Sequence, residues 1–169
     1  MFRMGAVAGL LALAGMLAAA AEPQIGSRAP AFEAKDQDGR TVRLADFLGK
    51  SAVVLYFYPK DDTPGCTREA CSLRDGYRAI QQAGAVVLGV SADGVDSHAA
   101  FARKFNLPFP LLADPDGALI KAYGVKMPLL KMAHRVTFII DRQGVVRFKV
   151  DKVDTDKHDR QVLDLLRTL

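Results

Sequence analysis

Both cysteines of the chain, Cys66 and Cys71, lie at the start of a segment with the period of an α-helix. Counting from Cys66, apolar side chains recur every three or four positions, at Ala70, Leu73, Tyr77 and Ile80. Thr63 is a favourable N-cap residue and Pro64 suits the first helical position, so Cys66 falls in the first turn. The unpaired N–H groups and the helix dipole there favour a thiolate over a thiol. Cys66 is therefore a candidate nucleophile on the inward face of the helix.

Two elements must position this cysteine: the strand before it and the helix that it opens. The apolar run over residues 52–58 predicts a buried strand, and the helix is expected over 64–82, ended by Gly84. A short hairpin of strands 31–34 and 41–44 precedes them. After them we predict a strand at 85–90 and a helix from an Asp96 or Ser97 cap to Phe105. Two prolines keep the stretch at 106–112 from being a regular helix. A short helix ending at Gly124, a loop at 125–134, a hairpin of strands 136–140 and 145–150, and a last helix capped by Thr155 or Asp156 are expected to follow.

This order of elements predicts the fold class. Strands that alternate with helices favour a mainly parallel core with right-handed crossovers, and the closing hairpin must add an antiparallel edge. The prediction is an α/β fold of the thioredoxin-like sandwich type: a central mixed sheet flanked by helices, with an N-terminal β-hairpin.

The first 21 residues have the pattern of a cleavable signal peptide. Arg3 supplies one positive charge, residues 5–21 are small and apolar, and Ala19, Ala20 and Ala21 form the cleavage site. We therefore predict export, to a periplasm, and one domain over residues 22–169. The alternative is an uncleaved anchor, although the 17 apolar residues are fewer than the roughly 20 of a spanning helix.

Composition limits the partners. Half of the 169 residues are hydrophobic and a quarter are charged, as in ordinary globular domains. The formal net charge is +4, and the lysines and arginines are scattered among acidic residues. Because the sequence shows no basic stripe with interleaved aromatic residues, we predict no nucleic-acid partner.

The cysteine pair has other interpretations. In an exported protein it could form a structural disulfide, although closing so short a loop removes little chain entropy. A copper-binding or electron-relay module is the alternative from another functional class. However, neither the Cys-x-x-x-Cys spacing of copper-delivery proteins nor the Cys-x-x-Cys of thioredoxin-type reductases occurs here. We predict no metal, haem, flavin or nicotinamide site.

The segment resembles the active-site segment of peroxiredoxins, which carry Pro-x-x-x-Thr-x-x-Cys, met here by Pro59, Thr63 and Cys66. The second cysteine, Cys71, is similar to that of the Q-type subfamily, also called bacterioferritin comigratory proteins. Residues 56–61 and 135–141 fit the same pattern, and the resemblance runs from about Ile25 to the C-terminus. It implies a thioredoxin-like fold and a thiol-dependent peroxidase that reduces hydrogen peroxide or organic hydroperoxides.

The resemblance implies roles for six residues: Cys66, Cys71, Thr63 and Arg135 in catalysis, and Pro59 and Gly65 in substrate binding. Cys66 would be the peroxidatic thiolate, oxidised to a sulfenic acid, and Cys71 the resolving thiol that forms a disulfide with it. Thr63 and Arg135 would hydrogen-bond the peroxide, and the charge of the arginine would favour ionised sulfur. A thioredoxin-family protein would re-reduce the disulfide, and relatives of this type imply a monomer. The three histidines, His98, His134 and His158, are predicted at surface positions, with His134 close enough to Arg135 to tune the pocket.

The spacing of the cysteines makes one further prediction. Residues five apart on a regular α-helix have Cα atoms roughly 8.7 Å apart and side chains that point in different directions. A disulfide tolerates a Cα–Cα distance of up to about 7 Å. A bond between Cys66 and Cys71 therefore requires the helix to unwind locally.

Overall fold

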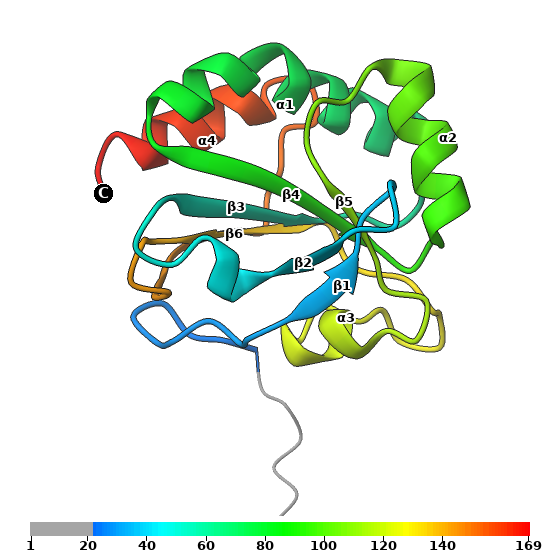
Figure 1. Cartoon of the computed structure of the whole chain (residues 1–169), viewed down its shortest axis with the longest axis horizontal. Coiled ribbons are helices and arrows are strands. Elements are labelled where there is room, and N and C mark those ends of the chain that lie inside the picture. Colours follow the sequence, from blue (N-terminus) through cyan, green and yellow to red (C-terminus); the bar gives the residue numbers. More distant parts are fainter. Residues whose placement is uncertain (1–21) are drawn as a thin grey trace, which may run out of the picture.

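The protein is described from a computed structural model that covers residues 22–169. The predicted signal peptide lies outside the described residues, so its cleavage stays a prediction. One seven-stranded sheet forms the centre, in the order β2-β1-β5-β4-β3-β6-β7 (Figure 1). Its strands are β1 (Glu33–Lys35), β2 (Thr41–Arg43), β3 (Ala52–Phe57), β4 (Ala85–Ser91), β5 (Leu111–Ala113), β6 (Val136–Ile140) and β7 (Val146–Val150). The helices are α1 (Pro64–Gln82), α2 (Val95–Phe105), α3 (Ala118–Ala122) and α4 (His158–Leu166), with a 3-10 turn at Leu44–Asp46.

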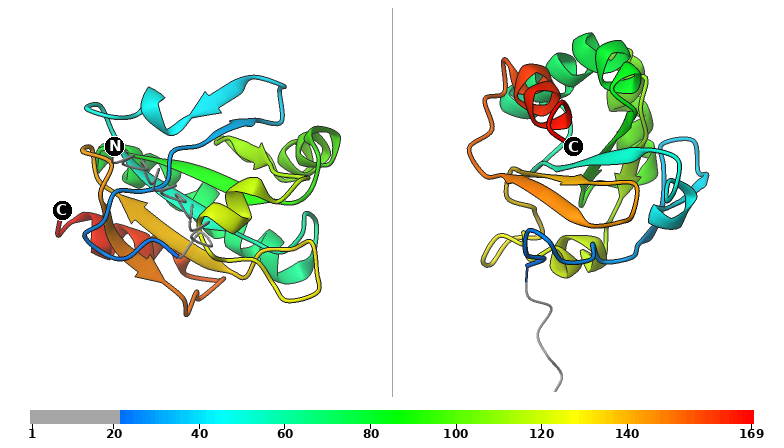
Figure 2. Two further views of the ribbon diagram at one scale, coloured as in Figure 1. Left: turned by 90° about the horizontal axis from the view of Figure 1, so that it is seen from below. Right: turned by 90° about the vertical axis from the view of Figure 1, so that its left-hand side faces the viewer.

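The sheet is mixed, and its middle strand carries the core. β3 pairs in parallel with β4 and antiparallel with β6, and all six of its residues are buried. Alternate residues face opposite sides. Val54 and Tyr56 pack in the core cluster under α1, α2 and α4, whereas Val53, Leu55 and Phe57 pack in the cluster that includes α3. Figure 2 shows α1 and α4 together on one face and α3 on the other.

The predicted fold class is confirmed, and α1 has the predicted bounds. Two local predictions are wrong, and one strand was not predicted. The N-cap residue of α2 is Gly94, not Asp96 or Ser97. The N-cap residue of α4 is Lys157, not Thr155 or Asp156. The stretch at 106–112 is not helical, as predicted, but its end opens the unpredicted β5, whose Leu111 and Leu112 pair in parallel with β4 directly after Pro110. Among residues 22–169, no helix has the length and apolarity needed to cross a membrane.

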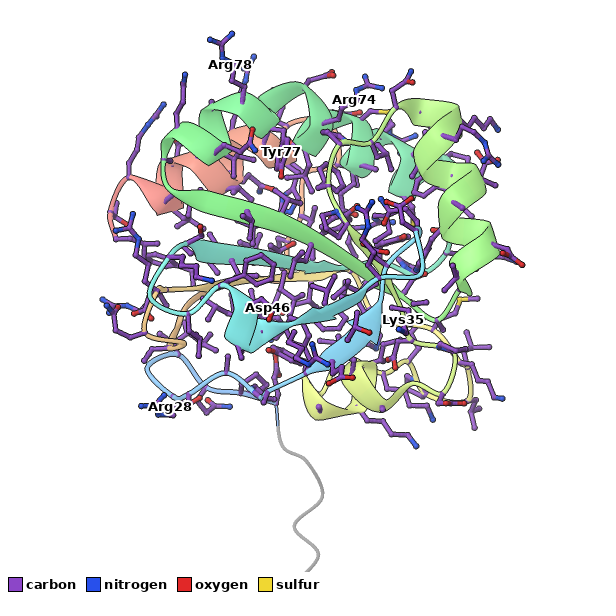
Figure 3. All side chains as sticks on the ribbon, viewed as in Figure 1. Arg28, Lys35, Asp46, Arg74, Tyr77 and Arg78 are labelled. Carbon is purple, nitrogen blue, oxygen red and sulfur yellow. The ribbon has the colours of Figure 1, made fainter. Side chains whose placement is uncertain are left out.

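Helix α1 packs against the sheet on one side and against α4 along its second half. Figure 3 shows Tyr77 on the side of the sheet and Arg78 pointing away from it. The contact with α4 is close at Gly76, where an added Cβ would lie 2.5 Å from the Cβ of Asp159. The Ser72 hydroxyl donates to the Asp159 carboxylate at 2.9 Å and accepts from the Asp159 backbone N–H at 3.1 Å. We call this contact of Ser72 and Gly76 with Asp159 the α1–α4 seam.

A methyl group at Gly76 should disturb the seam. Alanine favours a helix by about 1 kcal/mol over glycine, but overpacking costs typically about 1–3 kcal/mol. We expect Gly76→Ala to lower the free energy of unfolding by about 1–2 kcal/mol in urea denaturation. Arg78→Ala is the control, because Arg78 is exposed on the face of α1 that points away from the sheet. Equal stability of the two variants would contradict the close contact.

Candidate active site

The two cysteines lie on α1, and eight residues separate Cys66, in the first turn, from Phe57 at the C-terminal end of β3. Cys66 is the third residue of the helix and only 2% exposed, whereas Cys71 is half-buried. Both are free thiols. The helical geometry that separates residues five apart is therefore present, and Cys66 lies on the inward face of the helix, as predicted.

Thr63 occupies the N-cap position, but its side chain does not cap the helix. The prediction of a side-chain cap was wrong, because the hydroxyl instead donates to the carbonyl oxygen of Lys60 at 2.9 Å. Two consequences follow. The backbone N–H groups of Gly65 and Cys66, which have no partner within the helix, also receive no side-chain acceptor from Thr63. In addition, the hydrogen of the Thr63 hydroxyl is engaged by the Lys60 carbonyl, so the lone pairs of the hydroxyl oxygen remain able to accept a hydrogen bond from a ligand.

The sheet brings Arg135 to the start of α1. It precedes β6, and the register that pairs Val136 with Phe57 places it at the end of β3. Its Nη2 donates to the Cys66 sulfur at 3.4 Å, and its Nη1 donates to Glu69. Burial alone would lower the pKa of Arg135, but Glu69 and Cys66 raise it, so the guanidinium stays charged beside the sulfur.

Gly65 and Pro59 lie in different places relative to Arg135. An added Cβ on Gly65 would lie 3.1 Å from Nη2 of Arg135, so the missing side chain makes room for the guanidinium. Pro59 is half-buried and follows the buried Tyr58 at the end of β3. The structure thus brings Gly65 into contact distance of Arg135 and places Pro59 at the beginning of the same loop.

Glu69 is a member of the site that the sequence analysis missed. Its carboxylate is fully buried and pairs with Arg135, and its Oε1 makes no hydrogen bond to any described residue. Burial raises the pKa of Glu69 to about 7, although Arg135 acts to lower it. The spacing in the sequence could have indicated its position, because Glu69 lies three residues after Cys66, on the same inward face of the helix.

The raised pKa of Glu69 predicts a pH-dependent stability. From its ordinary value of 4.5 up to about 7, the folded protein holds a proton that the unfolded chain has lost. The free energy of unfolding should therefore fall as the pH rises through this window. We expect wild type to lose up to about 3 kcal/mol relative to Glu69→Gln between pH 4.5 and 7, measured by urea denaturation. Glu33→Gln, on the exposed β1, is the surface control. Parallel profiles for wild type and Glu69→Gln would contradict the assignment.

His158 lies behind Glu69, and the prediction that it is a surface residue was wrong. It is fully buried, with Nε2 2.8 Å from the Thr137 hydroxyl and Nδ1 3.0 Å from Oε1 of Gln161. Since the amide oxygen only accepts, Nδ1 carries the hydrogen and Nε2 accepts from Thr137. Burial lowers the pKa of His158, in agreement with this neutral form. Its Nε2 is 3.7 Å from Glu69, too far for a hydrogen bond.

The other two histidines differ from each other. His98 is also fully buried, contrary to the prediction, and bonds to Asp61 in the loop before α1. His134 is exposed, as predicted, and lines an open hollow of about 290 Å³ together with Arg135 and Lys149. Within residues 22–169, no three His, Cys, Asp or Glu side chains form a group that could hold a metal ion.

The arrangement suits attack by sulfur on a small polar substrate. Arg135 can stabilise the ionised form of Cys66 and the charge that develops on a leaving oxygen. Thr63 offers an acceptor, and the first-turn N–H groups of Gly65 and Cys66 offer donors. These groups come from two segments that are far apart in the sequence, the start of α1 and the residue before β6.

Comparisons with known proteins identify the family of this chain. Residues 25–149 match the model of the AhpC/TSA family. The chain is 45% identical over 146 residues to the chloroplastic peroxiredoxin Q of Triticum aestivum, covering 85% of this chain and 67% of the relative. It is similar to the crystal structure of peroxidoxin BcpB from Mycobacterium tuberculosis, with a TM-score of 0.82, 36% identity, and coverage of 88% and 99% of the two chains. It is also similar to the bacterioferritin comigratory protein of Xanthomonas campestris, a protein with alkyl peroxide reduction activity. For that structure the TM-score is 0.76, the identity 33%, and the coverage 81% of this chain and 90% of the other.

Proposed function

We propose that this chain, which belongs to the AhpC/TSA family and is a thiol-dependent peroxidase of the peroxiredoxin Q type, reduces hydroperoxides through Cys66 and Cys71. The observation that carries the proposal is the contact of Arg135 with the buried sulfur of Cys66 in the first turn of α1. A cation at this place favours the thiolate, and a helix N-terminus favours it further.

The first half of the reaction oxidises the enzyme. The thiolate of Cys66 attacks one peroxide oxygen, the O–O bond breaks, and the other oxygen leaves with the bonding electrons. This oxygen takes up a proton and departs as water or an alcohol. Cys66 becomes a sulfenic acid. Arg135 stabilises the charge on the leaving oxygen, and Thr63 accepts a hydrogen bond from the peroxide.

The second half restores the thiolate. The Cys71 sulfur attacks the sulfenic sulfur of Cys66, which forms a disulfide and releases water. The chain contains two cysteines, so Cys71 is the partner that the molecule itself supplies. A dithiol protein of the thioredoxin family then reduces the disulfide by exchange. No metal or organic cofactor takes part in these steps.

The proposed substrates are hydrogen peroxide and organic hydroperoxides. The alkyl peroxide reduction activity of the Xanthomonas campestris relative supports the organic class. We further propose that the protein acts after export, in a periplasm, as a monomer. This setting implies a thioredoxin-family reductant that is itself exported.

A trapping experiment tests the assignment of the two cysteines. In Cys71→Ser, one equivalent of hydrogen peroxide should give a sulfenic acid at residue 66 that a dimedone-type reagent captures and mass spectrometry locates. In Cys66→Ser, the same treatment should leave Cys71 a thiol. An adduct at Cys71 that forms at a comparable rate would reverse the roles of the two residues.

A further inference from the structure

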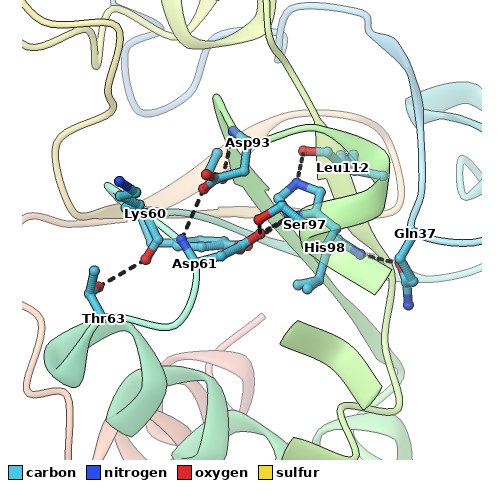
Figure 4. Close-up of polar contacts among 11 residues, drawn as sticks. Gln37, Lys60, Asp61, Thr63, Asp93, Ser97, His98 and Leu112 are labelled. Atoms are coloured by element: carbon cyan, nitrogen blue, oxygen red, sulfur yellow. Dashed lines mark hydrogen bonds and ion pairs between the residues drawn. The ribbon is translucent and has the colours of Figure 1, made fainter. Parts of the chain in front are cut away.

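A buried polar cluster lies beside the loop that joins β3 to α1 (Figure 4). Its centre is His98 of α2 and Asp61 of the loop, which are 0% and 8% exposed. His98 Nδ1 lies 2.8 Å from Oδ2 of Asp61, and its Nε2 lies 3.1 Å from the carbonyl oxygen of Leu112 in β5. The hydroxyls of Tyr58 and Ser97 also donate to the Asp61 carboxylate, at 2.6 and 2.7 Å. The Asp61 side chain thus ties the loop to Tyr58, directly after β3, and to α2, and His98 extends the link to β5.

The hydrogen-bond partners determine the charge of His98. The Leu112 carbonyl only accepts, so Nε2 must carry a hydrogen. Burial alone would raise the pKa of Asp61, but the bonds from His98, Tyr58 and Ser97 lower it, so this side chain is ionised. An ionised carboxylate only accepts, and Nδ1 therefore donates to its Oδ2. The proton accordingly sits on the ring, and Asp61 and His98 form a buried ion pair.

The ion pair acts on a peptide group that touches the active site. The carbonyl of Lys60 and the N–H of Asp61 belong to one planar unit, so fixing one end fixes the other. The Asp61 N–H donates to Oδ2 of Asp93 at 2.9 Å, while the Lys60 carbonyl accepts from the Thr63 hydroxyl at 2.9 Å. The direction of the Thr63 hydroxyl therefore depends on how firmly Asp61 is held.

We infer that the Asp61–His98 ion pair holds the Lys60 carbonyl in the orientation that aims the Thr63 oxygen at the peroxide. His98 is then a positioning residue for the oxidation of Cys66, although it lies on another helix and does not touch the substrate. This inference rests on the proposed role of Cys66. It also separates two properties of the site: Arg135 and the helix terminus govern the ionisation of the sulfur, whereas the ion pair governs the acceptor that receives the peroxide.

Two reactions of the same sulfur test this separation. The full chain, reduced, is mixed with hydrogen peroxide in a stopped-flow instrument to measure the second-order rate constant for oxidation of Cys66. Alkylation of Cys66 by iodoacetamide, which needs no Thr63 acceptor, is measured across the pH range. For His98→Gln we expect the peroxide rate constant to fall about 10- to 100-fold, as for a misplaced catalytic group, with alkylation changed less than about twofold. Asp61→Ala should have the same effect, and the double variant should be no slower than either single one.

Asp141→Asn is the matched control: Asp141 is also a buried carboxylate that holds a loop, but it lies in the β6–β7 turn, and both rates should stay unchanged. An unchanged peroxide rate constant in His98→Gln, or an equal fall of both reactions, would overturn the inference. If His98→Gln does not fold, Ser97→Ala removes one bond to Asp61 and should slow the peroxide reaction alone by about threefold; no change there would equally overturn it. A wild-type Cys66 that alkylates but does not react with peroxide would instead reject the proposed function.

Discussion

Replacing Arg135 by lysine should slow the reaction of Cys66 with hydrogen peroxide by roughly tenfold to a thousandfold, the range for losing one donor to the transition state. The reason is geometric. Two nitrogens of one planar guanidinium reach Glu69 and the Cys66 sulfur at the same time. A lysine ammonium keeps the charge but is a single point without this fork, so it cannot hold the buried carboxylate and also face the sulfur and the peroxide.

The measurement is the second-order rate constant of the reduced protein with hydrogen peroxide, followed in parallel with iodoacetamide alkylation. Alkylation should change less, because the positive charge is retained. Arg147→Lys is the matched control, since Arg147 pairs with Asp141 on the exposed side of β7 at 3.3 Å. Unchanged peroxide kinetics in Arg135→Lys would remove Arg135 from the transition state.

Formation of the disulfide should unwind the first two turns of α1. Both cysteines lie within one regular helix, which places their Cα atoms roughly 8.7 Å apart, beyond the reach of a disulfide. The seam with α4 begins at Ser72, directly after Cys71, so we expect the opening to be confined to residues 64–71.

Amide hydrogen exchange on the reduced and oxidised protein measures this change. Protection over residues 67–71, whose N–H groups are bonded in the helix, should fall by about a hundredfold or more on oxidation, as local opening approaches zero free energy, whereas residues 72–82 should stay protected. Cys71→Ser treated with peroxide is the control, because its Cys66 is oxidised without a disulfide and the helix should remain closed. Equal protection in both states, with the disulfide confirmed by mass, would refute the mechanism.

Local sequence signals were sufficient for α1 and for the fold class. Thr63, Pro64 and Gly84 mark the ends of the helix independently of its neighbours, and the predicted bounds are those observed. Local signals failed where residues distant in the sequence determine a hydrogen bond. The Thr63 hydroxyl could accept from the helix N–H groups or donate to the Lys60 carbonyl, and tertiary contacts fix the loop geometry that favours the carbonyl.

Buried polar residues were the main omission. Glu69, His98 and His158 are all fully buried, and polarity alone suggests a surface position for each. Their spacing gave a better indication. His98 lies three residues before Phe101, and His158 lies four before Val162, so each histidine shares the inward face of its helix with a core residue. Periodicity could have placed them in the interior, but their partners come from other elements and no local pattern names them.

The α1–α4 seam also bears on how much peroxide the protein survives. In the proposed mechanism, a second peroxide molecule can oxidise the sulfenic acid of Cys66 to the sulfinic acid before Cys71 reacts with it, and Cys71 cannot reduce the sulfinic acid. The lifetime of the sulfenic acid would then depend on how readily residues 64–71 open, and the seam at Ser72 and Gly76 would limit that opening. A longer seam would stiffen the segment and lower the inactivating peroxide dose, and a shorter one would raise the dose at the expense of the folded site. The position of this contact along the helix would thus determine how much peroxide inactivates the protein.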